Sequence, residues 1–475
     1  MKTIHYPAAD RKWEDVVNQN AIDQYFTMLE NWRQGAGSYG RLNLHACWGK
    51  ADVLDKKYQG ETIYIYNHLM HFAELLYDRF GDPKWRVRAN AMASQILYLQ
   101  AENGGFIHST SEFEPTFNTT GCPIHFFMPI LSLCQYYEWQ HADESIKALI
   151  PDAIERHFGF TMQAAWQKGN GRFHPLPFAG WCGVTNQDLV AVAAVAWSAK
   201  LFGTWDRYEK YGKPALDHIL SDYYYEKLGL FERGDGVNFT ERIAYYFVIL
   251  DMLDLIHKLT GDERLPPIID NVESHLLDGL YTGSDGYAHL SRGAVTDANE
   301  KNKTKILSWD RSSVTVSSYP GVILHVEQYL DRNPDLPEGP ELRKKLDALR
   351  RTLAAYTFAD GCAPMAFNPA NPVFTVVSMP DVEGMPYLLL YELGDRLSAP
   401  KPVRLPTVIR RYCGCTWKQN GCLWSFEKDG ERLYGGYSRY VAGITLGQNE
   451  RPVLGDFDAP VEYDVEEIID VGQTV

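Results

Sequence analysis

The sequence predicts a mainly α-helical chain folded as an (α/α)6 toroid, a ring of six helical hairpins, followed by a small antiparallel β module. Three observations lead to this fold class. A short phrase of glycine with apolar or aromatic residues recurs, amphipathic stretches alternate with more apolar ones, and the pattern changes after about residue 398. Recurrence at a fixed spacing is typical of an architecture built from repeated units.

The recurring phrase occurs six times, each time between two helical patterns. Its glycines are Gly40, Gly105, Gly171, Gly229, Gly286 and Gly361. Successive glycines are 57 to 75 residues apart. That spacing accommodates two helices with their loops in each unit.

An amphipathic stretch precedes each phrase and carries its charges on one side, as a solvent-facing helix does. These expected outer helices lie near residues 20–33, 84–101, 144–167, 206–225, 267–280 and 341–357. A more apolar stretch follows each phrase, and the run from Leu189 to Trp197 is apolar on nearly all sides. These expected inner helices lie near residues 62–80, 123–139, 186–203, 240–260, 312–330 and 381–396. Six apolar helices are buried together only in a closed ring, so the glycine loops should gather at one end of it.

Local signals predict where three inner helices begin. Pro123 suits the first helical position, Thr185 or Asn186 suits a cap, and Thr240-Glu241 suits another start. The β module is indicated by a proline-rich linker and by alternating runs at residues 423–426, 433–434 and 440–446, with a hairpin turn at Lys428-Asp429-Gly430. We therefore expect a catalytic toroid over residues 1–398 and the linker with the β module over residues 399–475.

The architecture resembles the six-hairpin superfamily over about residues 15–398. The phrase Asn103-Gly104-Gly105-Phe106, before an inner helix, is similar to a Gly-Gly-Phe-like phrase common there. The superfamily includes unsaturated glucuronyl hydrolases and other glycosidases, and similar toroids occur in polysaccharide lyases, many of which also carry a β module. The resemblance implies a carbohydrate-active enzyme. It assigns no catalytic residue, because the Asp-Asn helix signature of the glucuronyl hydrolases is not matched.

Composition narrows the class of partner. The net charge is −15, and such a chain repels nucleic acid. Aromatic residues make 13% of the chain and often line sugar ligands. No apolar run reaches the ~20 residues of a membrane span, and Met1 to Asp10 lack a secretory pattern. We expect a cytoplasmic protein with a glycan as substrate and no membrane partner, or a secreted or periplasmic one if a leader was removed. The sequence is compatible with a homo-oligomer.

No metal or other cofactor is expected. The sequence has no phosphate-binding loop, no dinucleotide fingerprint and no zinc-protease helix. Its eight cysteines are scattered, and the one cluster is Cys413, Cys415 and Cys422. That cluster lacks a fourth nearby ligand and the spacing of common zinc loops. Free thiols are the expectation.

Two chemistries fit the residues of the loop end. Glycoside hydrolysis needs two carboxyl groups, for which the candidates are Asp188, Glu241 and Asp310. Elimination at a uronate needs a base and a group that neutralises the sugar carboxylate. The candidate bases are His174, His289 and Tyr319. The expected substrate-binding residues, suited to stacking on sugars and pairing with acids, are Trp48, His108, Trp181, Asn186, Arg233, Arg242, Arg292, Trp309 and Arg311.

Asp188 has two possible roles in the sequence, as a catalytic general acid or as a helix cap. Desolvation by Trp181 and Leu189 would raise its pKa toward that of a general acid, whereas a place in the first turn of a helix favours the ionised form. The same carboxylate could simply cap that helix. We expect a hydrolase that cuts a glycosidic bond at or next to a uronic acid in oligosaccharides. A lyase and a non-catalytic glycan-binding protein remain the alternatives.

Overall fold

A computed structural model gives the fold of most of the chain. It describes residues 2–35, 66–106, 108–110, 114–118, 122–167, 171–173, 183–234, 239–297, 303–359, 361, 363–369, 371–378, 384–404, 407–412, 415–420, 423–428, 431–437 and 465–470.

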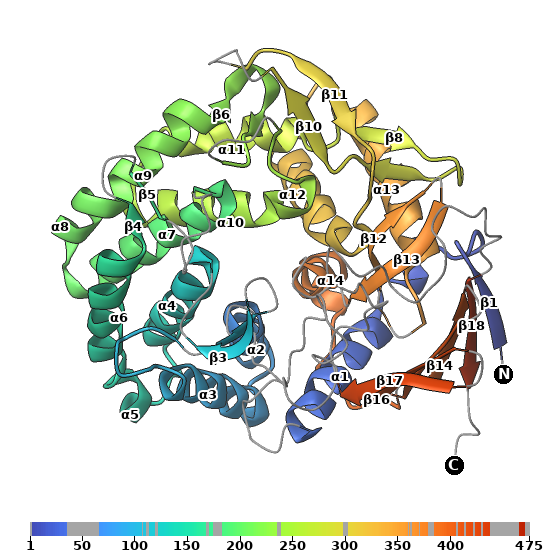
Figure 1. Cartoon of the computed structure of the whole chain (residues 1–475), viewed down its shortest axis with the longest axis horizontal. Coiled ribbons are helices and arrows are strands. Elements are labelled where there is room, and N and C mark those ends of the chain that lie inside the picture. Colours follow the sequence, from blue (N-terminus) through green and yellow to red (C-terminus); the bar gives the residue numbers. More distant parts are fainter. Residues whose placement is uncertain are drawn as a thin grey trace.

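The helices form two concentric rings (Figure 1). The outer ring consists of α1 (Gln19–Gly35), α3 (Pro83–Tyr98), α6 (Ile150–Ala164), α8 (Trp205–Arg207) continued by η5 (Tyr208–Gly212), α9 (Lys213–His218) and η6 (Ile219–Tyr223), then α11 (Leu265–His275) and α13 (Gly339–Tyr356). The inner ring consists of α2 (Tyr66–Phe80), α4 (Pro123–Glu138), α7 (Thr185–Phe202), α10 (Tyr246–Thr260), α12 (Tyr319–Arg332) and α14 (Met385–Leu393). The short α5 (Glu144–Lys147) precedes α6. Each expected stretch holds its helix, and the (α/α)6 toroid is confirmed.

All six inner helices were predicted, but the residues at which they begin were predicted less accurately. Pro123 does begin α4. At α7 the cap position is Val184, and the Thr185 hydroxyl donates instead to the Glu232 carbonyl oxygen at 2.7 Å. The prediction of a cap at Thr185 or Asn186 was therefore wrong, because a neighbouring loop takes up the hydroxyl.

Two inner helices begin later than expected. A 3-10 turn, η8 (Ile243–Tyr245), precedes α10, and η9 (Val316–Ser318) precedes α12. The residues before these turns pair with other loops. Thr240, before η8, forms a β-bridge with Glu232, and the carbonyl oxygen of Asp310, before η9, accepts from the Arg292 N–H at 2.8 Å. Backbone groups used in this way are not available to extend a helix.

The connections from outer to inner helices carry small antiparallel sheets. The pairs are β2 (His108–Thr110) with β3 (Glu114–Asn118), β4 (Trp166–Gln167) with β5 (Arg172–Phe173), β6 (Tyr224–Tyr225) with β7 (Leu230–Phe231), β8 (Leu280–Thr282) with β9 (Ala288–Leu290), β10 (Gly293–Thr296) with β11 (Ile306–Asp310), and β12 (Ala363–Asn368) with β13 (Asn371–Ser378).

Two glycines mark turns that touch the next unit: Gly229 of the recurring phrase, and Gly104, which directly precedes Gly105 of that phrase. Gly104 has φ 89° and Gly229 has φ 57°, both in the left-handed region that favours glycine. A Cβ on Gly104 would collide with the Arg156 carbonyl oxygen of α6. A Cβ on Gly229 would lie 2.8 Å from the Asn271 carbonyl oxygen of α11. At these two positions the turn packs closely against the following outer helix, whereas Gly286 and Gly361 have open space around them.

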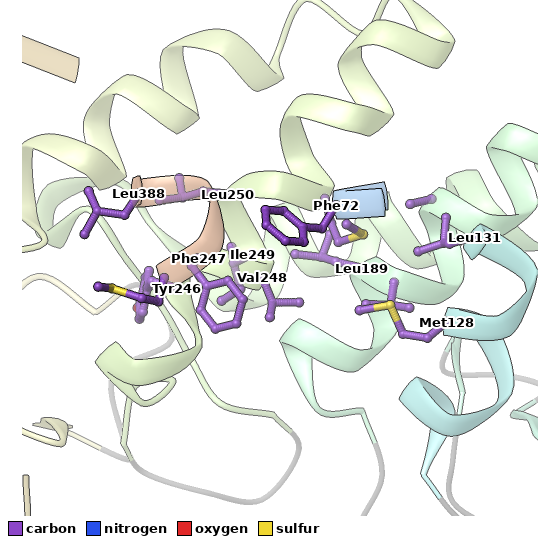
Figure 2. Close-up of a cluster of buried hydrophobic side chains, with 14 of the residues drawn as sticks. Phe72, Met128, Leu131, Leu189, Tyr246, Phe247, Val248, Ile249, Leu250 and Leu388 are labelled. Atoms are coloured by element: carbon purple, nitrogen blue, oxygen red, sulfur yellow. The ribbon is translucent and has the colours of Figure 1, made fainter. Parts of the chain in front are cut away.

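The centre of the ring is an apolar core. Figure 2 shows a cluster of buried apolar side chains, with labels on Phe72, Met128, Leu131, Leu189, Tyr246, Phe247, Val248, Ile249, Leu250 and Leu388. These residues belong to α2, α4, α7, α10 and α14. Leu189 and the residues up to Ala196 are fully buried, as the apolar run in α7 predicted. Burial of such side chains is the main stabilising contribution to the ring.

A six-stranded antiparallel sheet lies beside the ring (Figure 1). Its order is β1 (Lys2–Tyr6), β18 (Val465–Asp470), β14 (Thr407–Tyr412), β15 (Cys415–Asn420), β16 (Leu423–Lys428) and β17 (Glu431–Tyr437). Lys428 pairs with Glu431, so the expected hairpin turn is confirmed, whereas the run at 440–446 lies outside the described residues. The first strand was not anticipated: β1 pairs with β18 although the sequence analysis placed residues 2–6 with the toroid.

Within the described ranges, no helix combines the length and the apolar character of a membrane span.

Candidate functional site

Connections from three units are joined by backbone pairing at the start of α7 and α10. Val184 forms an isolated antiparallel β-bridge with Gly234, and Phe239 forms another with Val295. The two loops approach so closely that a Cβ on Gly234 would collide with the Gly183 carbonyl oxygen. The pairing gives a fixed frame from which the side chains of the site project.

Three arginines converge on this frame. The guanidinium groups of Arg233 and Arg242 each lie 5.9 Å from the centre of the Tyr245 ring. Arg292 is joined to the same place because its carbonyl oxygen accepts from the Ile243 N–H at 3.0 Å. Partial burial lowers the pKa of Arg292, and repulsion from Arg242 and Arg233 lowers it further. The three charges are therefore close enough to repel one another.

Two carboxyl groups accompany the arginines in contrasting environments. Glu241 is fully buried, forms an ion pair with Arg233 and accepts from the Arg242 N–H at 2.9 Å. Burial raises the pKa of Glu241, although Arg233 and Arg242 oppose the rise. Asp310 is a third exposed and lies 3.7 Å from Arg292. Partial burial would raise the pKa of Asp310, but hydrogen bonds from Ser312 and the nearby arginines lower it.

Asp310 does not cap α12, because that helix begins only at Tyr319. Its carboxylate instead accepts from the Ser312 N–H at 2.9 Å. The second carboxylate oxygen of Glu241 and the Asn186 amide oxygen are buried, and neither has a hydrogen-bond partner among the residues that the structure describes. An unpaired buried acceptor is unfavourable, so both atoms are suited to receive a hydrogen bond from a ligand.

Asp188 is fully buried, as Glu241 is. It forms an ion pair with Arg172, and both side chains are fully buried. The Arg172 guanidinium also stacks on the Tyr223 ring at 4.5 Å. The pair joins the start of α7 to β5 and supports the site from behind.

His289 and Tyr319 form a buried network that also includes Asp285, which the sequence analysis did not name. The His289 Nε2 atom is 2.7 Å from Asp285, and its Nδ1 atom is 3.2 Å from the Tyr319 hydroxyl. Tyr356 donates to the same carboxylate. The spacing of Asp285 and His289, four residues apart across the β8–β9 turn, is the only sequence signal for this pair.

The remaining candidates are dispersed. Trp309 packs against Gly279, where an added Cβ would lie 2.7 Å from its ring. Arg311 lies 4.6 Å over the Tyr281 ring. His108 lies in β2. Trp48, His174 and Trp181 lie outside the described residues, as do Cys413 and Cys422. Among the residues that the structure describes, no group of three or more His, Cys, Asp or Glu side chains could hold a metal ion.

Comparison with known proteins establishes the fold. The chain is similar to the cellobiose 2-epimerase from Bacillus thermoamylovorans B4167, with a TM-score of 0.57 and 11% identity over 79% of this chain and 99% of that one. It is similar to a sugar epimerase from a ruminal bacterium, with a TM-score of 0.55 and 12% identity over 78% and 97%. An unsaturated glucuronyl hydrolase from Bacillus sp. GL1 matches with a TM-score of 0.46 and 13% identity over 81% and 97%. The two epimerase structures confirm the toroid fold expected from the sequence. No family model and no curated protein matches the chain.

Proposed function

We propose that the protein is a carbohydrate-active enzyme that hydrolyses a glycosidic bond at or next to a uronic acid. The observation that carries this proposal is the cluster of Arg233, Arg242 and Arg292 at the loop end of the ring. Guanidinium groups bind carboxylates through two parallel hydrogen bonds, so the cluster suits the carboxylate of an acidic sugar. The sugar-processing enzymes with the same fold support the broader class.

The local charge favours an anionic ligand even though the chain is acidic overall. Three arginines with Glu241 and Asp310 leave an excess of one positive charge, against −15 for the whole chain. The site also lies at the N-terminal ends of α7 and α10, whose dipoles favour negative charge there. The two effects act in the same direction.

The two carboxyl groups supply an acid and a base. Environments that move two pKa values apart are typical of such a pair, and here burial raises that of Glu241 while hydrogen bonding lowers that of Asp310. Ionised Asp310 takes a proton from water, whose oxygen attacks the anomeric carbon. Glu241 gives its proton to the glycosidic oxygen as the bond breaks.

Arg233 couples substrate binding to the acid. In the free protein it pairs with Glu241 and thereby favours the ionised carboxylate. When the sugar carboxylate competes for Arg233, Glu241 loses part of this stabilisation, and its pKa rises further. The acid is thus protonated when substrate is bound.

Turnover of unsaturated uronyl oligosaccharides tests the proposal. Hydrolysis releases the unsaturated uronic acid as a free sugar, whose ring opens and whose enol becomes the 5-keto form. The conjugated double bond is thereby lost, so absorbance near ~235 nm falls. Arg292→Gln should lower kcat/KM for the uronide about 10- to 100-fold, the cost of one charged hydrogen-bond partner, and leave turnover of the matching neutral glycoside unchanged. Arg156→Gln, on the outer helix α6, is the control and should behave as the wild type. Equal loss on both substrates would show that Arg292 does not bind the carboxylate.

Sugar epimerisation is the second candidate, favoured by the sugar epimerases that share the fold. In that case proton NMR of a reducing disaccharide shows a new epimer, and no bond is cut. A rise in absorbance near ~235 nm on a saturated polyuronate would instead identify a lyase. Binding of the glycans without turnover would identify a binding protein.

A further inference from the structure

A groove on the outside of the ring is lined mainly by basic side chains. It lies between the N-terminal segment, with Arg11, Lys12 and Trp13, and one face of α13, with Arg343, Lys344 and Arg351. Its volume is about 920 Å³, within the range of ligand-binding clefts. Six cationic and two acidic side chains line it. We call this feature the α13 groove.

Two of the six cations of the α13 groove are paired with carboxylates. Arg350 pairs with Glu327 and Glu392, and Lys344 lies 3.9 Å from Glu341. Lys12, Arg343 and Arg351 are all exposed, and within the described ranges no ion pair to a carboxylate is formed by their side chains. Three unneutralised charges in one concave surface repel one another, and a bound anion relieves that repulsion.

The shape of the groove suits an extended ligand. Arg343, Asp347 and Arg351 follow one face of α13 at intervals of four residues. The arginines are thus about 12 Å apart along the helix axis, at 1.5 Å per residue. A linear chain with regularly spaced anions can contact both arginines, whereas one small anion cannot.

The groove also leads toward the loop end of the ring. Arg11 donates to the Thr357 carbonyl oxygen just beyond α13. It lines a second cavity of about 90 Å³, which is also lined by Tyr25 of α1 and by Met385, the first residue of α14. The α13 groove and the start of an inner helix are therefore linked through Arg11.

We propose that the α13 groove binds a segment of a linear acidic glycan outside the active site, with Lys12, Arg343 and Arg351 pairing with its anionic groups. This inference rests on the proposed function, because it takes the same class of substrate. Carboxylate and sulfate groups share the required charge. The groove would hold a long substrate close to the loop end and add nothing to the binding of a short one.

The test is calorimetric binding of long glycans to the full chain. The variant is Arg343→Gln with Lys344→Gln and Arg351→Gln, three exposed positions that leave the core intact. Its control, with the same loss of charge on another part of the surface, is Lys210→Gln with Lys213→Gln and Lys227→Gln. We expect the groove variant to bind polygalacturonate about tenfold more weakly than the wild type and the control to bind it normally. Heparin in a parallel arm separates sulfate from carboxylate recognition, and weakened binding of either polymer supports the groove.

The assay keeps the two proposals distinguishable. Failure of turnover removes the proposed function, while polymer binding still reports on the α13 groove. Equal binding by wild type and groove variant overturns the inference, as does absence of polymer binding by the wild type. Tighter binding of a DNA duplex, or equal binding of neutral dextran, also overturns it. Where turnover is observed, kcat/KM of the groove variant should fall on polymers and stay unchanged on disaccharides.

Discussion

His325 is expected to make the stability of the ring depend on pH. It lies on α12 between two carboxylates, with Nε2 3.3 Å from Asp251 on α10 and Nδ1 3.2 Å from Glu273 on α11. Arg332 of α12 pairs with the same Glu273, and Tyr387 of α14 faces Asp251. Burial lowers the pKa of His325, but the hydrogen bonds and charges of the two carboxylates outweigh it and raise the pKa from 6.5 to about 9.

The size of the effect follows from this rise. Each tenfold change in proton affinity corresponds to about 1.4 kcal/mol, so protonated His325 stabilises the fold by about 3 kcal/mol. Because the folded pKa is the higher one, the contribution is complete below pH 6.5. It is lost as the pH rises from 6.5 through about 9. Above that range the histidine is neutral in both states and the contribution disappears.

Urea unfolding of wild type and His325→Gln, followed by tryptophan fluorescence, measures this contribution. The free energy lost in the variant should be about 3 kcal/mol larger at pH 6 than at pH 10. His157 supplies a contrast of opposite sign, because burial lowers its pKa to about 4. The penalty of His157→Gln should therefore shrink as the pH falls from 6.5 toward 4. A His325→Gln penalty that is the same at pH 6 and pH 10 would refute the reasoning.

Two further predictions concern the packing of the repeats and the support of the site. Gly104→Ala should destabilise the fold by about 3 kcal/mol or more, because its Cβ collides with the Arg156 carbonyl oxygen, whereas Gly81→Ala, at φ 66° with open space around it, should cost only about 1 kcal/mol. Asp188→Asn should cost about 3 to 5 kcal/mol by breaking a buried ion pair, and the double variant Arg172→Met with Asp188→Leu should recover most of that loss. Chemical unfolding measures all four proteins, and a double variant that is no more stable than Asp188→Asn would contradict the reasoning about the pair.

The fold was predictable because its signals are local and repeated. The apolar run from Leu189 to Trp197 identifies an inner helix by itself, and the recurring glycines set the unit length. The helix starts were less predictable because they depend on contacts between loops. Thr185 is a good cap by residue type, yet its hydroxyl bonds to the Glu232 carbonyl oxygen, 47 residues away. No local pattern contains that information.

The sequence indicated candidate residues one by one but not their arrangement. Backbone pairing between two connections places Arg233 and Arg242 at the Tyr245 ring, with Arg292 hydrogen-bonded through its carbonyl oxygen to Ile243. The pairing of β1 with β18 could not be predicted from local sequence either, because the two strands lie near opposite ends of the sequence. Asp285 was not predicted, because a single acidic residue in a turn is common in sequences. Only the structure shows that it pairs with the buried His289.

The charge distribution is compatible with the proposed binding of an acidic ligand at one end of the ring, although the whole chain is acidic. Exposed Asp78, Glu138 and Asp331 lie in the last turns of three inner helices, far along the chain from the glycine loops. Successive inner helices are parallel, since each follows an outer helix that runs the other way. Their N-terminal ends therefore meet at the loop end, where the arginine cluster lies. At physiological salt, charges beyond about 8 Å are largely screened, so a ligand at the loop end responds to the arginines and helix dipoles rather than to the net charge.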